Sequence, residues 1–219
     1  MIFGIPSYRR AYRQTTLALL ADLGVPKKDI IVCTQTQEDY EVYKEAGVGD
    51  SAELACIPAS CVAEARNNLL TFIDDGKEMV MLDDDIADIE RLDGDILVPV
   101  RDAEELHGIV ADGFSHARRM KTIAFTCVIN ANARVRPCVS RLGMSGGAFI
   151  GLIKGPDVRF SADRPLEEVT YFYSDVLRKY KALPRLDWLH VWAGVCQPGG
   201  CEEERERFLL AAKHRRCGA

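Results

Sequence analysis

Apolar and polar residues along the first ninety positions follow a pattern that predicts strands and helices in alternation. Short apolar runs predict strands over residues 2–5, 29–34, 53–57 and 79–82. Apolar residues at helical spacing, closed by glycines, predict helices over residues 10–23, 37–45 and 62–74. This order predicts βαβ units and a mostly parallel sheet, in which right-handed crossovers bring the loops after successive strands to one edge.

The second half of the chain is less regular but keeps the α/β character. Its apolar patterns predict helices over residues 102–119, 165–181 and 202–216, and strands over 122–129, 148–153 and 187–195. Residues 130–141 predict an irregular basic loop, and residues 143–147 are glycine-rich. Because neither a repeat nor a linker interrupts the pattern, we expect one α/β domain over residues 1–219, with a mostly parallel sheet flanked by helices.

Three consecutive carboxylates, Asp83, Asp84 and Asp85, directly follow the predicted strand over residues 79–82. Their mutual repulsion costs free energy unless a cation or protons offset it, and aspartate is a poor strand former. Mg²⁺ and Mn²⁺ bind carboxylate oxygens together with substrate phosphates, and open α/β sheets bind ligands at the carboxyl ends of their strands. The cluster therefore predicts a divalent-metal site, with a solvated acidic turn as the alternative.

Composition narrows the class of protein. The chain has 219 residues, 47% of them hydrophobic, and a net charge of −5, which suits one buried core and excludes a uniformly basic coat for nucleic acid. None of the eight cysteines has the C-x-x-C spacing of a zinc or redox pair. Cysteines within apolar runs favour a reducing cytosol. Since no apolar run has the length of a membrane span and no signal peptide opens the chain, we expect a cytoplasmic protein without a membrane partner.

The order of these features resembles a known enzyme family. Residues 5–10 (IPSYRR) follow the first strand, residues 65–67 (ARN) lie in the third helix, and residues 82–86 (LDDDI) come about a dozen residues later. The succession resembles nucleotide-sugar glycosyltransferases of the GT-A fold, and looks most like the TET/JBP-associated glycosyltransferases of phages and base-modification systems. The resemblance implies a nucleotide-sugar-binding half over residues 1–90 and an acceptor-binding half over residues 91–219.

The same resemblance implies a substrate and a place. It implies transfer of a sugar from a nucleotide sugar, with UDP-sugar expected, to a hydroxymethylated pyrimidine in DNA. A phage-encoded enzyme of this kind would act in the host cytoplasm. A carbohydrate, lipid or protein acceptor is the alternative within the same fold.

Family roles can be carried onto individual residues. In such enzymes an Asp-x-Asp pair holds Mn²⁺ or Mg²⁺, which here implies Asp83 and Asp85, with His190 as a candidate third ligand. Asp84 is then expected to face the ribose or sugar. The residues expected to bind the nucleotide sugar are Pro6, Ser7, Tyr8, Arg9, Thr34, Gln35, Arg66, Asn67, Asp83 and Asp84.

Several of these assignments have a structural alternative. Tyr8 either stacks on the nucleobase or is a half-buried turn residue. Arg66 either binds phosphate or pairs with an aspartate of the tip, and both roles can coexist. A lone histidine in an apolar strand, as at His190, is more often a core residue than a ligand.

A transferase also needs a base for the acceptor hydroxyl. Glu167 and Glu168 open the predicted helix over residues 165–181, where the resemblance places that base; the family's usual form is Glu-Asp. Adjacent helical side chains diverge by about 100°, so only one can face the site, and we favour Glu168. The alternative is that both stabilise the positive end of the helix dipole.

Two other functions share parts of this pattern. A sugar nucleotidyltransferase usually opens with a glycine-rich basic phosphate loop, where this chain has Pro6, Ser7 and Tyr8. A phosphorylated receiver module carries its acids on separate strands, whereas here three are contiguous.

Overall fold

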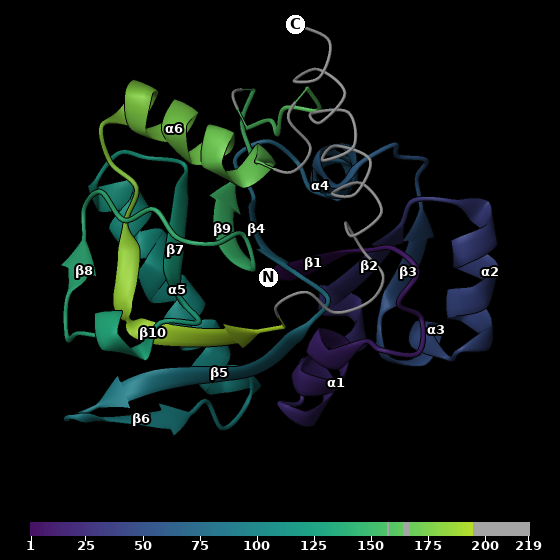
Figure 1. Ribbon diagram of the computed structural model, residues 1–219, viewed down its shortest axis with the longest axis horizontal. Coiled ribbons are helices and arrows are strands. Elements are labelled where there is room, and N and C mark those ends of the chain that lie inside the picture. Colours follow the sequence, from purple (N-terminus) through teal and green to yellow (C-terminus); the bar gives the residue numbers. More distant parts are fainter. Residues whose placement is uncertain (157, 164–166, 195–219) are drawn as a thin grey trace, which may run out of the picture.

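The computed structural model of the protein describes residues 1–156, 158–163 and 167–194, and within these ranges ten strands form one sheet (Figure 1). The strands are β1 (Ile2–Ser7), β2 (Ile30–Thr34), β3 (Glu53–Cys56), β4 (Glu78–Leu82), β5 (Ile86–Asp93), β6 (Ile96–Pro99), β7 (Ala124–Ile129), β8 (Val139–Ser140), β9 (Phe149–Ile153) and β10 (Arg185–Ala193). The α-helices are α1 (Thr15–Asp22), α2 (Gln37–Glu45), α3 (Val48–Ser51), α4 (Val62–Leu69), α5 (Ala103–Arg119) and α6 (Glu168–Tyr180). Three 3₁₀ turns accompany them, η1 (Lys27–Asp29), η2 (Leu70–Phe72) and η3 (Asn132–Arg134).

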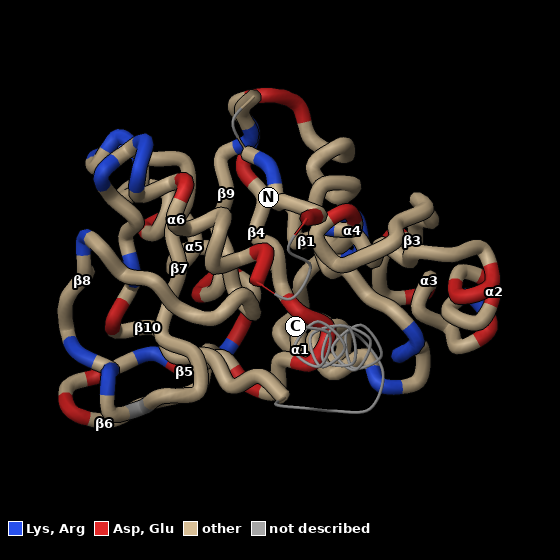
Figure 2. The backbone as a smooth tube through the Cα atoms, turned by 45° about the horizontal axis from the view of Figure 1, so that its top comes forward, with Lys and Arg blue, Asp and Glu red and all other residues tan. Residues whose placement is uncertain are grey.

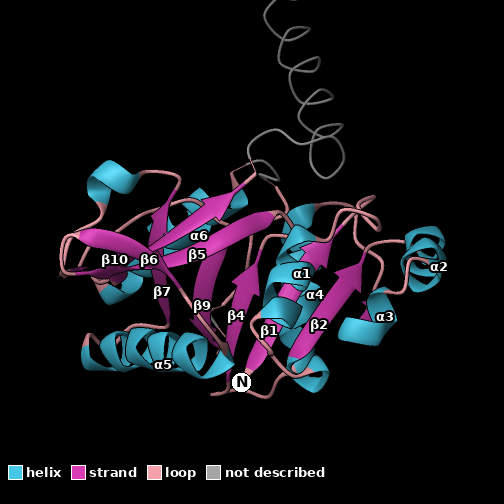
Figure 3. Cartoon of the chain, turned by 90° about the horizontal axis from the view of Figure 1, so that it is seen from below, coloured by secondary structure: helices cyan, strands magenta, loops and turns pink. Residues whose placement is uncertain are grey.

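The sheet has a parallel half and a mixed half. Its strand order is β3-β2-β1-β4-β9-β7-β10-β5-β6, with β8 paired to β10. The first four strands are mutually parallel, so β1, β2 and β4 end at the same edge (Figure 3). β9 runs antiparallel between β4 and β7, and the β5–β6 hairpin extends the sheet beyond β10. The α/β fold expected from the sequence is confirmed.

Helices cover both faces of the sheet, and alternate residues of each strand supply the two cores. On β4, Val80 and Leu82 pack into a core with residues of α1, α2 and α5, whereas Met79 and Met81 pack into a second core with α4 and α6. All four side chains are fully buried. Burial on both faces explains why the first strands read as continuous apolar runs.

The structure differs from the predicted elements in several places, among them the unpredicted short helix α3 and the short strand β8 within the predicted loop over residues 130–141. The predicted helix over residues 10–23 begins only at Thr15, because the Arg10 side chain donates to Asp84 and the Gln14 side chain to Ser7 instead of continuing a helix. Residues 86–99, for which no element was predicted, form the β5–β6 hairpin, with Gly94 at a φ of 62° in its turn. The predicted helix over 62–74 changes to a 3₁₀ turn after Leu69.

Other sequence expectations concern the chain as a whole. The predicted helix over residues 202–216 lies outside the described residues. None of the described helices is both long and apolar enough to cross a membrane. The cysteines within the described ranges are free thiols: Cys33, Cys56, Cys61, Cys127 and Cys138. Burial raises the pKa of Cys33 to about 11, as befits a small hydrophobic residue rather than a reactive one.

Candidate active site

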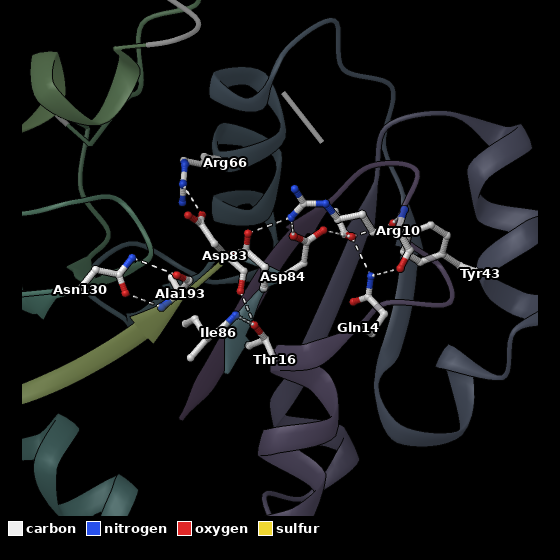
Figure 4. Close-up of polar contacts among 12 residues, drawn as sticks. Arg10, Gln14, Thr16, Tyr43, Arg66, Asp83, Asp84, Ile86, Asn130 and Ala193 are labelled. Atoms are coloured by element: carbon white, nitrogen blue, oxygen red, sulfur yellow. Dashed lines mark hydrogen bonds and ion pairs between the residues drawn. The ribbon is translucent and has the colours of Figure 1, made fainter. Parts of the chain in front are cut away.

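The aspartate cluster forms the turn that joins β4 directly to β5, at the edge where the parallel strands end. Thr16, at the start of α1, holds this turn: its hydroxyl donates to the Asp83 carbonyl (2.5 Å) and accepts from the Ile86 amide (2.8 Å). The Gly194 amide donates to the Asp85 carbonyl (2.9 Å). With the backbone fixed in this way, Asp83 turns toward Arg66 and Asp84 toward Arg10 (Figure 4).

Asp84 is buried and is bound by the last residue of β1 and by the loop that follows it. The Ser7 hydroxyl donates to its Oδ2 and the Arg10 guanidinium to its Oδ1, each at 2.5 Å. The Tyr43 hydroxyl, from α2, lies 2.7 Å from the Ser7 hydroxyl. Burial raises the pKa of Asp84 to about 6 in spite of Arg10. Ser7 and Asp84, both expected to contact the donor, are instead turned toward each other and connect three elements.

Arg10 bridges two of the three aspartates. The same Nη1 that binds Asp84 lies 3.1 Å from Asp85 Oδ2, and the Gln14 amide donates to the Arg10 carbonyl at 3.0 Å. Burial opposes the charge of the guanidinium, but the two carboxylates outweigh it and raise the pKa of Arg10. Burial, followed by repulsion from Asp83, raises the pKa of Asp85. Sequence reasoning did not assign Arg10 to the tip.

Asp83 turns the other way, toward Arg66 of α4 and Glu168 at the start of α6. Arg66 is only 2% exposed; its Nη2 donates to Asp83 Oδ1 at 2.6 Å, and its Nε lies 3.4 Å from Glu168 Oε1. The predicted ion pair between Arg66 and an aspartate of the tip is therefore present. Burial raises the pKa of Glu168, and Arg66 opposes this rise.

These three residues open into a cavity of about 220 Å³. Its lining consists of Arg66, Asp83, Ser145, Gly146, Gly147, Glu167, Glu168, Val169 and Thr170. Glu168 is 7% exposed, whereas Glu167 is exposed at the rim. Of the two candidate bases, Glu168 thus has the buried position beside Asp83, and the glycine-rich loop forms the facing wall.

A larger cavity of about 680 Å³ lies on the other side of the tip. It is lined by Tyr8, Arg9, Arg10, Ala11, Tyr12, Arg13, Thr36, Glu38, Asp39, Val42 and Tyr43. Asp39 is 9% exposed, and its Oδ2 has no hydrogen-bond partner in the described part of the chain. Burial raises the pKa of Asp39. A buried carboxylate oxygen without a donor is costly, so Asp39 is suited to a ligand that brings an N–H group.

The structure brings only part of the expected donor set to this cavity. Tyr8 and Arg9 line it, with the Arg9 guanidinium 4.9 Å from the centre of the Tyr8 ring. Thr34 is fully buried and donates to the Ala55 carbonyl (3.2 Å), and Pro6 is buried within β1. Gln35 is also buried and does not line it.

Asn67 and His190 have other partners. The Asn67 amide group bonds the backbone of Phe160 at both ends (2.8 and 2.9 Å), so it holds that segment against α4. His190 is fully buried in β10, where its Nδ1 lies 3.0 Å from Glu90 Oε2. Glu90 lies four residues beyond Ile86 on β5, so at 3.3 Å per residue it is about 13 Å along the strand from the end of the acidic tip. The expectation of His190 as third metal ligand is therefore wrong: strand packing, not the acidic tip, fixes its place.

The tip fits a metal only as a two-carboxylate site. Within residues 1–156, 158–163 and 167–194, no group of three or more His, Cys, Asp or Glu side chains is placed to hold a metal ion. Mg²⁺, however, is usually held by one or two carboxylates, with phosphate and water in its other positions. Asp83 and Asp85 suit that mode, because each contacts its arginine through one oxygen and the Asp83 side chain is 36% exposed.

Solved structures of other proteins share the fold of this chain. TarS 1–349 from S. aureus superposes with a TM-score of 0.56 at 14% identity, over 88% of this chain and 60% of that chain. TarS 1–349 in complex with UDP gives 0.53 at 14%, over 89% and 61%. A protein classed as a nucleotide-diphospho-sugar transferase from Desulfovibrio desulfuricans G20 gives 0.53 at 16%, over 89% and 83%.

The chain shares the fold of these proteins. It spans about 60% of the length of TarS 1–349. No family model and no curated protein matches the sequence.

Proposed function

We propose that the protein is a metal-dependent glycosyltransferase that moves a sugar from a UDP-sugar to an acceptor hydroxyl, that of a 5-hydroxymethylpyrimidine in DNA. One observation carries this proposal: the acidic tip lies between two cavities. Asp83 lines the smaller one, while Asp84 and Asp85 bind Arg10, which lines the larger. The fold shared with the UDP complex of TarS supports it.

The larger cavity suits the nucleoside of the donor. The Tyr8 ring offers a face for stacking, and Asp39 Oδ2 accepts an N–H of a base edge; uracil presents one at its N3. The residues of this cavity all come from 8–43, and those of the smaller cavity come mainly from 145–170. This division supports a donor-binding half over residues 1–90 and an acceptor-binding half over 91–219.

The smaller cavity suits the reacting groups. Glu168 takes the proton of the acceptor hydroxyl while the acceptor oxygen forms a bond to C1 of the sugar. The bond between C1 and the diphosphate breaks, and its electron pair leaves with UDP. Arg66 holds Asp83 and Glu168 at the two sides of this cavity. A divalent ion held by Asp83 and Asp85 would supply positive charge for the departing diphosphate.

The donor half of the proposal is tested by ligand-dependent stability. In the presence of Mn²⁺, UDP at one hundred times the Kd of UDP should stabilise the protein by about 2.7 kcal/mol. This stabilisation is measured as a rise in melting temperature. Asp85→Ala should lose the part of this rise that depends on Mn²⁺. The matched control is Asp95→Ala, which removes an exposed acid from the β5–β6 turn and should behave like wild type. An unchanged melting temperature under saturating UDP and Mn²⁺ would contradict the proposal.

The acceptor half needs a separate measurement. DNA containing 5-hydroxymethylcytosine is incubated with Mn²⁺ and a panel of UDP-sugars, and the nucleosides are weighed by mass spectrometry. Addition of one sugar residue supports the DNA acceptor. If UDP binds but no UDP-sugar changes the mass of any nucleoside, the result favours a carbohydrate, lipid or protein acceptor.

A further inference from the structure

A third cavity, rich in arginine, lies next to the paired strands β8 and β10. Its volume is about 320 Å³, and it is lined by Arg134, Arg136, Ser140, Arg185 and Asp187. Three positive side chains face one negative one, a net charge of +2 in a chain whose net charge is −5. Figure 2 shows basic segments gathered around β8 and the adjoining part of β10. We call this the arginine cavity.

The one acid of the arginine cavity is fully engaged. Asp187 is 3% exposed; its Oδ1 accepts from Arg185 Nε at 2.5 Å, and its Oδ2 accepts from the Ser140 hydroxyl. It therefore orients the Arg185 fork and offsets one of the three positive charges, which leaves the net charge of +2. Arg134 and Arg136 lie exposed at the rim, so their charge is available to a ligand.

The arginine cavity is joined to the proposed reaction site by one short loop. Arg185 Nη1 donates to the Met144 carbonyl (3.1 Å), and Arg66 Nη2 donates to the Gly147 carbonyl (3.4 Å). Met144 and Gly147 are three residues apart, at most about 11 Å between their Cα atoms at 3.8 Å per step. The two cavities therefore border the same short loop, and an acceptor long enough to cross this loop would reach both.

We propose that the arginine cavity binds a phosphate group of the acceptor and so holds the acceptor hydroxyl toward Glu168. Planar guanidinium forks match the oxygens of a phosphate, and three of them converge here without a free acid to compete. A cavity of about 320 Å³ has room for a phosphate group. The inference rests on the proposed function for the identity of the reaction, but the anion site itself does not depend on it.

The experiment observes the arginine side chains directly. The protein with ¹⁵N-labelled arginine is saturated with UDP and diamagnetic Mg²⁺ to fill the donor cavity, and inorganic phosphate is then titrated in a chloride buffer while the arginine Nε–Hε resonances are recorded by NMR. We expect saturable shifts, Arg185 among them. The variant Arg134→Gln/Arg136→Gln, which changes only exposed side chains, should weaken phosphate binding at least tenfold.

Controls separate a site from general screening. Lys28→Gln removes an exposed positive charge near the start of β2 and should leave the titration unchanged. Shifts that are linear, that equal ionic strength from chloride reproduces, or that survive in the double variant would overturn the proposal.

A second titration with dimethyl phosphate identifies the source of the phosphate. Binding of dimethyl phosphate supports a phosphodiester such as a nucleic-acid backbone, whereas binding of inorganic phosphate alone supports a phosphate monoester. Failure of UDP alone to bind, with phosphate binding intact, would count against the proposed function only.

Discussion

Glu168 has the position and environment of a general base. It is 7% exposed, sits beside Asp83, and has a pKa raised by burial. Only the ionised carboxylate can take a proton, so sugar transfer should rise with pH through this raised pKa.

Replacing the carboxylate gives a direct test at this residue. Glu168→Gln keeps the size of the side chain but cannot accept the proton, and we expect sugar transfer to fall 10²- to 10⁴-fold and to lose its rise with pH. Binding of UDP with Mn²⁺ should be unaffected, because the donor cavity is lined by other residues. Glu167→Gln, at the exposed neighbour, is the control. Equal losses in the two variants would show that the negative charge at the helix start matters rather than proton transfer.

At the residue scale, sequence reasoning found side chains that are contiguous or lie on adjacent elements. The Asp83–Arg66 pair was anticipated because an aspartate tip and a helix arginine 17 residues earlier face each other in a βαβ unit. Arg10 and Asp39 were not assigned to the site, since their partners are set by how loops fold back. Asp39 is the second acid in the first turn of α2, where it reads simply as an acid favoured by the helix dipole.

At the scale of elements, α5 approaches the sheet through a close fit between one ring and two glycines. A Cβ at Gly151 of β9 would lie 1.9 Å from the Phe125 ring, and one at Gly113 of α5 would lie 2.3 Å from it. Phe125 is fully buried and also meets Phe114 edge-on. The space left by the two glycines is therefore filled by the phenyl group.

This fit predicts an overpacking penalty. Gly151→Ala should lower the free energy of unfolding by about 1–3 kcal/mol, because the ring or the strand must move. Urea unfolding measures the change, and adding Phe125→Leu should recover part of it. Gly108→Ala, on α5 with nothing within 4 Å of the added Cβ, is the matched control and should stabilise by about 0.5–1 kcal/mol. Equal effects of the two alanines would argue against the packing explanation.

Sequence patterns predicted best the elements whose boundaries are marked by residues within or next to the element itself. The strands of the parallel half and helices α2 and α5 were placed within two residues, because apolar runs and capping residues such as Thr36 and Asp102 mark them. The β5–β6 hairpin was missed although Asp93-Gly94 is a strong turn signal. Apart from Ile86 and Ile89, its strand residues are exposed or only partly buried, so their apolar alternation is weak.

At the scale of the whole molecule, Asp84 ties together parts that are distant in sequence. Through Ser7, Arg10 and Tyr43 it joins the loop after β1, helix α2 and the turn between β4 and β5. Two of these residues, Arg10 and Tyr43, also line the larger cavity. Unfolding the molecule releases Asp84 to water, so its protonation is coupled to global stability.

The sign of this coupling follows from the direction of the pKa shift. In the folded protein the pKa of Asp84 is about 6, against about 3.9 for an unfolded aspartate. As pH rises from about 4 to 6, the unfolded state loses its proton first, so this group lowers the free energy of unfolding, by at most roughly 3 kcal/mol for two pKa units. Asp84→Asn does not titrate, so between about pH 4 and 6 its stability should fall less steeply than that of wild type. Urea unfolding at several pH values measures both slopes, with Asp95→Asn as the exposed control; parallel slopes for wild type and Asp84→Asn would show that burial of this carboxylate carries no such cost.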